Sequence, residues 1–433
     1  MSRRAGAAAA TPRAAAPLRN RVALAALCTT VTTGYGVLFY AFPVLAPAIA
    51  ADTGWSPTTV TAAFSLSQVV AGLSGIPVGR WLERAGPRVV MTAAAALAVP
   101  ATAAIAAAPA LWAFFLAWAA AGAAMAGLFY PPAFAAITRW YGPRRVPALT
   151  ALTLVAGLSS TVFAPATAAL EHAFGWRGAY LALAAVLALV VLPLHAFAPT
   201  PPWRPAGGAT GPPRPAEEGE GRGAIMGGRP FLALSAALTL GAFGVYAVVV
   251  NLVPLLEERG YGTAAAAWAL GVGGLGQVLG RLAYAPLEHR TSPVVRTVAV
   301  LAACAATTGL LGLVAGPFAL VLVVALAAGT VRGVLTLLQA TAVSDRWGTE
   351  RYAALNGVLH TPIMLAVALA PWAGAALAVP LGGYPAVFSA LAAIGALGAL
   401  AAATGPGGRA ARGRPGPPSP VSPTASSVPE EFR

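Results

Sequence analysis

The chain contains no lysine, and only 9% of its 433 residues are charged. A soluble protein of this length needs far more polar surface, so this shortage of charge excludes a water-soluble class. With 58% hydrophobic residues, the composition predicts a protein that crosses a membrane many times. All 27 basic residues are arginine, which together with the abundant alanine indicates a GC-rich, bacterial coding sequence.

Cysteine and the usual signatures of catalysis are scarce as well. Cys28 and Cys304 fall in different hydrophobic runs, so no disulfide framework is expected. No phosphate-binding loop, metal-ligand spacing or catalytic Ser-His-Asp set occurs. The sequence therefore predicts neither an ATP-driven pump nor an enzyme, and no cofactor or metal. The first apolar run is a full span, so we expect no cleavable signal and interpret residues 1–21 as an inner tail rather than a transit peptide.

Twelve apolar runs are each long enough to cross a hydrocarbon core of about 30 Å. They cover 22–49, 57–79, 89–108, 111–138, 147–170, 179–198, 231–255, 264–287, 295–315, 317–343, 353–378 and 384–404. Residues 199–230 combine proline, glycine and glutamate without hydrophobic periodicity and predict a linker. The predicted fold is all-α, with six-helix bundles at 22–198 and 231–404 and a disordered tail at 405–433.

The two predicted bundles resemble each other at a constant spacing of 206 residues. Arg84 corresponds to Arg290, Pro87 to Pro293, and Tyr141 to Trp347. Internal duplication of this kind is typical of secondary transporters.

The distribution of arginine predicts the orientation of the chain in the membrane. Arg177 and Arg259 are the basic residues expected in outer loops, whereas most others fall in inner loops and tails. This asymmetry predicts a multi-pass protein of the inner (plasma) membrane with both termini in the cytoplasm. It also accounts for the net charge of +14 without a nucleic-acid partner.

The segment after the second span, residues 79–88, resembles the loop-2 signature of the major facilitator superfamily. The resemblance rests on Gly79, Glu83, Arg84, Gly86 and Arg88. It implies a gating motif in which glycines allow a tight turn and close helix contact, while the acid–base pair locks the inner side closed in one state. The alternative is that these arginines only anchor the inner side.

Three loop motifs narrow the resemblance to the monocarboxylate-transporter-like branch, which carries organic anions. They are 54–56 (Gly-Trp-Ser), 140–145 (Trp-Tyr-Gly-Pro-Arg-Arg) and 174–177 (Phe-Gly-Trp-Arg). The chain departs from the branch in the first span, which has no lysine and carries Thr-Thr-Gly-Tyr-Gly at 32–36 in place of an acidic-Gly motif. The fifth span lacks the Gly-Pro-Gly-Gly cluster typical of drug–proton antiporters.

Two arginines lie within predicted spans, both in the second bundle. Arg332 is near the centre of its span, where burying a guanidinium costs about 2.5–3.5 kcal/mol, and no Asp or Glu lies mid-span to neutralise it. We expect a substrate anion to be its partner; the alternative is bonding to carbonyls near Gly329 and Gly333. Arg281 shares a helical face with Gln277, and the resemblance implies that it faces the substrate anion. The alternative is that it snorkels to the nearby span end or packs between helices.

Other polar residues within spans are weaker candidates for the solute site. Gln339 extends the face of Arg332, and Asn356 shares a face with His360, which could carry a proton or cap the backbone near Pro362. Aromatic and amide residues that could line the cavity, or merely pack between helices, are Tyr35, Tyr40, Tyr130, Tyr246 and Asn251.

Together these features predict a transporter that works by alternating access and carries a small organic anion, most simply a carboxylate. Transport is either secondary active or facilitative. The expected partners are the lipid bilayer and the solute, with a coupling proton or a counter-anion in the secondary active case, and the carrier is expected to act as a monomer. Alternatives are an exporter of neutral or amphiphilic compounds and a non-transporting sensor of the same fold.

Overall fold

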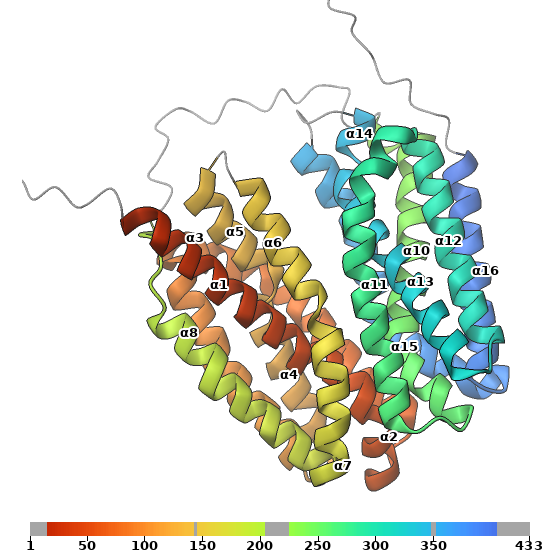
Figure 1. Cartoon of the computed structure of the whole chain (residues 1–433), viewed down its shortest axis with the longest axis horizontal. Coiled ribbons are helices and arrows are strands. Elements are labelled where there is room, and N and C mark those ends of the chain that lie inside the picture. The colour runs from red at the N-terminus through yellow and green to blue at the C-terminus, as the bar shows by residue number, and fades with distance from the viewer. Residues whose placement is uncertain (1–14, 143–144, 204–224, 348–351, 405–433) are drawn as a thin grey trace, which may run out of the picture.

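The computed structural model describes residues 15–142, 145–203, 225–347 and 352–404. Within these ranges every regular element is helical, and the helices form two bundles that stand side by side (Figure 1). The predicted N-terminal tail, most of the predicted linker and the C-terminal tail lie outside the described residues.

The first bundle is built from the helices that precede residue 203. They are α1 (Ala15–Tyr35), η1 (Gly36–Tyr40), α2 (Ala41–Thr53), α3 (Pro57–Ala107), α4 (Leu111–Leu128), α5 (Tyr130–Tyr141), α6 (Arg145–Gly157), α7 (Ser159–Val186), η3 (Leu187–Val191) and α8 (Leu192–Phe197).

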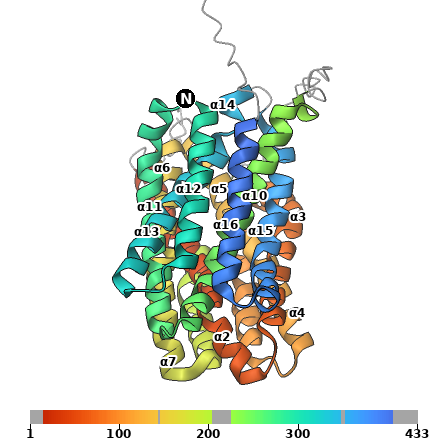
Figure 2. The same ribbon diagram turned by 90° about the vertical axis from the view of Figure 1, so that its right-hand side faces the viewer.

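The second bundle follows from residue 229 onward. It contains α10 (Arg229–Glu258), α11 (Thr263–Arg290), α12 (Pro293–Leu313), α13 (Phe318–Thr341), α14 (Ser344–Trp347), α15 (Tyr352–Leu381) and α16 (Tyr384–Thr404). Seen from the side of this bundle, its long helices run between α14 at one end and the region of α2 and α7 at the other (Figure 2). We call these the α14 end and the Gly54 end.

Ten helical runs in the described residues are long and apolar enough to cross a membrane. Two of them, Pro57–Ala107 and Arg145–Phe197, contain 51 and 53 residues, or about 75–80 Å of helix at 1.5 Å per residue. That exceeds twice the hydrocarbon thickness of about 30 Å. Each run is broken by a glycine with non-helical backbone, Gly86 (φ 81°, ψ 168°) and Gly175 (φ 65°, ψ 173°). The ten runs therefore have room for the twelve crossings predicted from the sequence.

The two bundles converge toward the Gly54 end, near α2 and α7 (Figure 1). Hydrogen bonds join them there: the Ser65 hydroxyl accepts from the Trp372 backbone N–H at 3.2 Å, and the Thr161 hydroxyl donates to the Gly271 carbonyl at 2.8 Å. Toward the middle of the molecule the contacts between bundles pass through arginine side chains, which belong to the candidate site.

Candidate functional site

The position of Arg332 depends on close packing between α11 and α13. A Cβ atom added to Gly329 would lie 1.9 Å from the carbonyl oxygen of Gly273, and one added to Gly333 would lie 2.1 Å from that of Gln277. Only glycine permits backbones to approach this closely, as small residues do between membrane helices. Because Gly329 and Gly333 flank Arg332 on α13, their packing brings Gln277 beside the guanidinium.

Arg332 makes its polar contacts with neutral groups. Its Nη2 donates to the Tyr40 hydroxyl at 2.8 Å. With the Gln277 amide oxygen turned toward it, that oxygen lies 3.0 Å from Nε and 3.2 Å from Nη2. Within the described residues the ion pairs are Asp52–Arg177 and Asp345–Arg296, so no carboxylate neutralises Arg332 there. The alternative of bonding to carbonyls near Gly329 and Gly333 is not what the structure shows.

Tyr40 reaches Arg332 from the opposite bundle. It ends η1, a π-helical turn, and such a turn shifts the direction of the side chains that follow it. At the start of η1 the Phe163 ring packs directly on Gly36, where an added Cβ would lie 2.2 Å from the ring. The Tyr40–Arg332 contact therefore ties the first bundle to the second at mid-molecule.

Arg281 also bridges the bundles. Its guanidinium donates to the backbone carbonyl of Thr153 on α6. Gly157 leaves room for this approach, because an added Cβ would lie 3.0 Å from Nη1. The Tyr130 side chain lies close enough to interact with the same guanidinium. Arg281 is thus packed against the other bundle, which differs from snorkelling outward.

Three phenol side chains, Tyr40, Tyr130 and Tyr246, lie near the two arginines, and a fourth, Tyr35, lies beside them. Tyr246 of α10 lies within electrostatic reach of both Arg332 and Arg281. Tyr35 stacks on Phe129, with ring centroids 3.8 Å apart, and interacts with the hydroxyls of Tyr40, Tyr130 and Tyr246. Phenols can both donate and accept hydrogen bonds, so this ring of groups suits a solute that carries oxygen atoms.

Of the remaining predicted residues, Asn251 has its hydrogen-bond partners elsewhere in the second bundle. Asn251 is fully buried and donates to the carbonyls of Ala247 (2.8 Å) and Pro371 (3.4 Å), which places it between α10 and α15. The Gln339 amide nitrogen is buried without a hydrogen-bond partner in the described part of the chain. His360 lies part-buried on α15 with an interaction of its own, and the Asn356 side chain lies outside the described set.

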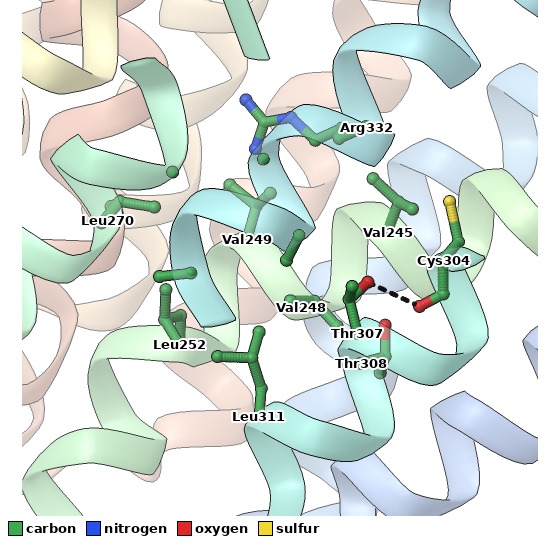
Figure 3. A pocket seen from close by; sticks show the side chains of 14 residues that line it. Val245, Val248, Val249, Leu252, Leu270, Cys304, Thr307, Thr308, Leu311 and Arg332 are labelled. Atoms are coloured by element: carbon green, nitrogen blue, oxygen red, sulfur yellow. Dashed lines mark hydrogen bonds between the residues drawn. The ribbon is translucent and has the colours of Figure 1, made fainter. Parts of the chain in front are cut away.

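A small cavity opens beside Arg332 inside the second bundle. Its volume is about 40 Å³, and it lies between α10, α11, α12 and α13. Arg332 lies at one end of the lining side chains and Leu311 at the other (Figure 3). The sequence signalled neither this cavity nor the pairing of Tyr40 with Arg332, because both depend on how helices distant in sequence pack.

The predicted gating motif lies at the α14 end of the first bundle. Gly86 adopts the left-handed backbone that a tight turn requires, as predicted. At Gly79 an added Cβ would meet nothing within 4 Å. Glu83 and Arg84 are exposed and form no ion pair with the described residues, while the Arg88 guanidinium donates to the Ala198 carbonyl.

The family of the chain follows from its sequence. The sequence profile of the Major Facilitator Superfamily matches residues 23–361. The chain belongs to the major facilitator superfamily. The superfamily is one of multi-pass membrane transporters and not of enzymes. No group of three or more potential metal-binding side chains occurs in the described residues.

Several relatives are monocarboxylate transporters. Monocarboxylate transporter 13 of Rattus norvegicus is 28% identical over 262 residues, which cover 59% of this chain and 57% of that protein. Monocarboxylate transporter 11 of Mus musculus is 33% identical over 36% of this chain and 34% of its own length. The matches therefore span between a third and somewhat more than half of these transporters.

Solved structures share the fold at low sequence identity. A bacterial homologue of the human lysosomal transporter Spinster, in an inward-facing and unoccupied conformation, superposes with a TM-score of 0.67 at 18% identity. The match covers 89% of this chain and 93% of that one. A POT family transporter in complex with 5-aminolevulinic acid gives a TM-score of 0.66 at 14% identity, over 87% and 94%. These similarities establish the architecture alone.

Proposed function

We propose that this member of the superfamily transports a small organic anion, most simply a carboxylate, by alternating access. The observation that carries the proposal is the uncompensated charge of Arg332. A guanidinium is always ionised, and its contacts with Tyr40 and Gln277 satisfy hydrogen bonds without cancelling that charge. A carboxylate would supply the missing negative charge and can accept two parallel N–H bonds.

The contact between Tyr40 and Arg332 gives the solute a means to influence the two bundles. In this conformation the Tyr40 hydroxyl accepts one N–H of the guanidinium across the bundle interface. A carboxylate bound at Arg332 competes for that N–H and loosens the tie, while Tyr35, Tyr130 and Tyr246 offer replacement hydrogen bonds. A ligand shifts the balance between two conformations only if it binds one of them more tightly. Replacement of the Tyr40 hydroxyl by the carboxylate at Arg332 provides this difference in affinity.

The direction of opening follows from where the bundles touch. Contacts at Ser65 and Thr161 hold them together toward the Gly54 end. With arginine concentrated at the α14 end, the positive-inside rule assigns that end to the cytoplasm. The protein then works in the plasma membrane as two six-helix bundles, 22–198 and 231–404, with cytoplasmic termini and an inward-facing conformation.

Uptake by proteoliposomes tests the role of Arg332. With labelled acetate, lactate, butyrate and benzoate as probes, Arg332→Gln should weaken apparent affinity about ten- to a hundredfold, since a charge-assisted bond contributes about 1.5–3 kcal/mol. Arg332→Lys should retain part of the apparent affinity, because lysine keeps the positive charge but lacks the two parallel N–H donors of the planar guanidinium. Arg229→Gln, at the exposed start of α10, is the matched control.

Unchanged uptake by both Arg332 variants would remove the anion site. Competition by simple carboxylates also separates the proposal from its alternative, because an exporter of neutral amphiphiles should be indifferent to them.

A further inference from the structure

A second cavity lies inside the first bundle, and it shares no lining residue with the cavity beside Arg332. The helices α1, α3, α5 and α8, all in the first bundle (Figure 1), contribute to its wall. Arg88 of the predicted gating motif, Trp140 and His195 bring polar side chains to it. Its volume is about 20 Å³, and about 10–15 Å³ suffices for one water molecule. The cavity therefore has room for a single small ligand.

His195 and Trp140 each carry a buried nitrogen atom that lacks a hydrogen bond. His195 is 6% exposed, and neither its Nε2 nor the Trp140 Nε1 has a partner among the described residues. Buried polar atoms are nearly always paired, because leaving one unpaired is unfavourable. Two such atoms in the wall of one small cavity point to a ligand that pairs with both.

Hydrogen bonds around the cavity hold these side chains in position. The Arg88 guanidinium donates to the Ala198 carbonyl and so joins α3 to the end of α8. The Asn20 amide donates to the Trp140 carbonyl at 3.5 Å, and the Tyr141 hydroxyl donates to the Asn20 carbonyl at 2.9 Å. The second pair of contacts fixes the end of α5 against α1.

The polar side chains of this wall suit a ligand that accepts hydrogen bonds. Indole and guanidinium N–H groups can only donate, and a neutral imidazole donates from Nε2 in one of its two tautomers. In the described part of the chain no carboxylate lines the cavity, and Arg88 adds a positive charge. A monatomic anion can accept from all three groups and also balances that charge, which a water molecule does not.

We propose that this cavity binds one small inorganic anion, such as chloride, between Trp140, His195 and Arg88. The site is independent of the transported solute, because it lies within the first bundle and does not include Arg332. An anion with several heavy atoms is too large for it. The bound anion links α5 and α8 to Arg88 and thereby stabilises the end of the first bundle that carries the predicted gating motif.

Thermal unfolding of the purified full-length protein tests the site with chloride as the probe. Sodium chloride is compared with sodium methanesulfonate at equal ionic strength, because methanesulfonate is too large for the cavity. A ligand that binds the native state raises the melting temperature in proportion to its occupancy. We therefore expect a higher melting temperature in chloride, with an effect that saturates as the chloride concentration rises.

Substitutions in the wall should remove this dependence on chloride. Trp140→Phe removes one donor and keeps an aromatic ring, and His195→Leu removes another. Each should weaken the apparent affinity for chloride about ten- to a hundredfold, because each deletes a hydrogen bond to a charged group. Trp81→Phe is the matched control, since Trp81 is exposed on α3 and should not affect the response. Arg332→Gln should also leave the chloride response unchanged, which separates this site from the solute site.

Bromide gives a direct measurement that needs no variant. Crystals of the wild-type protein grown in sodium bromide should show an anomalous scattering peak within hydrogen-bond distance of Trp140 Nε1 and His195 Nε2. This measurement decides the question even if a cavity variant fails to fold.

Three results would overturn the proposal. Equal melting temperatures in the two salts, or bromide peaks only outside the cavity, would leave a water molecule as its occupant. An undiminished chloride response in folded Trp140→Phe and His195→Leu variants would place the anion elsewhere. Loss of the response in Arg332→Gln would assign it to the solute site. None of these results bears on anion transport, which the uptake measurements with the Arg332 variants test separately.

Discussion

The two turns at the α14 end occupy equivalent positions in the duplicated sequence but are built differently. Gly86-Pro87 begins the second part of α3, and Ser292-Pro293, 206 residues later, begins α12. In the first turn Gly86 takes a backbone conformation open only to glycine. In the second, the Ser292 hydroxyl caps the helix by accepting from the Val295 N–H.

The groups that cover these turns differ even more. Over the first turn lies Trp203, which donates to the Glu83 carbonyl at 3.0 Å and stacks its ring 4.5 Å from the Arg139 guanidinium. The residue equivalent to Arg139 is Asp345, which forms an ion pair with Arg296 beside the second turn. Aromatic packing at one turn thus corresponds to a charge network at the other.

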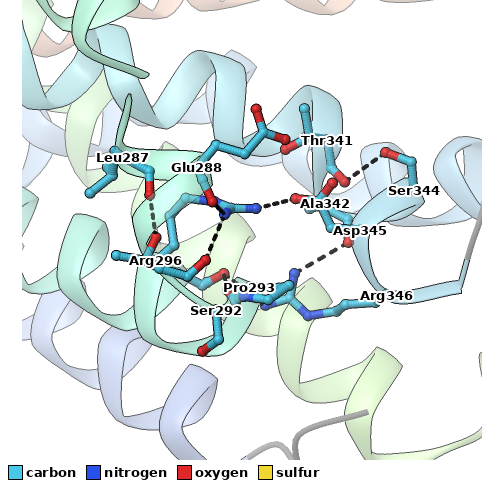
Figure 4. A network of polar contacts seen from close by, with 12 residues as sticks. Leu287, Glu288, Ser292, Pro293, Arg296, Thr341, Ala342, Ser344, Asp345 and Arg346 are labelled. Atoms are coloured by element: carbon cyan, nitrogen blue, oxygen red, sulfur yellow. Dashed lines mark hydrogen bonds and ion pairs between the residues drawn. The ribbon is translucent and has the colours of Figure 1, made fainter. Parts of the chain in front are cut away.

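Arg296 is only 2% exposed, so its pairing with Asp345 occurs almost without water. Arg346 joins the same network by donating to the Pro293 carbonyl at 3.0 Å and the Thr297 hydroxyl at 2.7 Å (Figure 4). Burial lowers the pKa of Arg346 to about 10, which leaves it protonated at neutral pH. The second half therefore holds a charge network at its turn, whereas Glu83 and Arg84 of the first half form no ion pair with the described residues.

Removing the carboxylate of Asp345 at the second turn should produce the largest difference in stability between the two turns. Asp345→Asn leaves Arg296 and Arg346 close together without an anion and should lower the free energy of unfolding by about 3–5 kcal/mol. The matched change in the first half, Glu83→Gln, alters an exposed carboxylate and should change the free energy of unfolding by no more than about 0.5 kcal/mol. Unfolding in detergent micelles measures the loss of stability in both variants. Similar losses would show that the two turns are stabilised to the same extent by their acidic residues.

A methyl group at the first turn should have the next largest effect. Gly86→Ala forces alanine into a glycine-only region and places its Cβ 2.8 Å from the Trp203 ring, so we expect a loss of about 1–3 kcal/mol in unfolding free energy.

Gly175→Ala separates the cost of backbone strain from the cost of the clash with Trp203. Gly175 has similar backbone angles, but an added Cβ there would have no atom within 4 Å. Gly86→Ala should be the more destabilising, and Trp203→Ala in the same chain should recover part of the difference. A cost at Gly86 no greater than at Gly175 would mean that Trp203 exerts no constraint there.

Removal of the helix cap at the second turn should have the smallest effect. Ser292→Ala should cost about 0.5 kcal/mol, near the low end for caps, because its hydroxyl–N–H distance is 3.4 Å. Ser56→Ala removes a cap of the same kind at the start of α3, where the Thr59 N–H lies 3.1 Å from the Ser56 hydroxyl. This change should lower the free energy of unfolding by about 1 kcal/mol. Thermal unfolding of the two variants ranks them, and the reverse order would contradict the geometric argument.

Much of the architecture was predictable because its signals are local. Span length and hydropathy, the breaks near Gly86 and Gly175, and the family of the chain follow from short stretches of residues. The isolation of Arg332 from carboxylates in its span was also readable from the sequence, because no Asp or Glu lies mid-span. Its partners were not: Gln277 was expected to share a face with Arg281, yet the glycine contacts between α11 and α13 bring it to Arg332.

The amino-acid sequence by itself determined that this chain enters a membrane as a superfamily transporter, since hydrophobic length and charge asymmetry act on each segment independently. The tertiary structure alone decided that Tyr40 meets Arg332 across 292 residues and that an apolar cavity lies beside that pair. Such contacts depend on the distance and rotation between packed helices, which no single segment encodes.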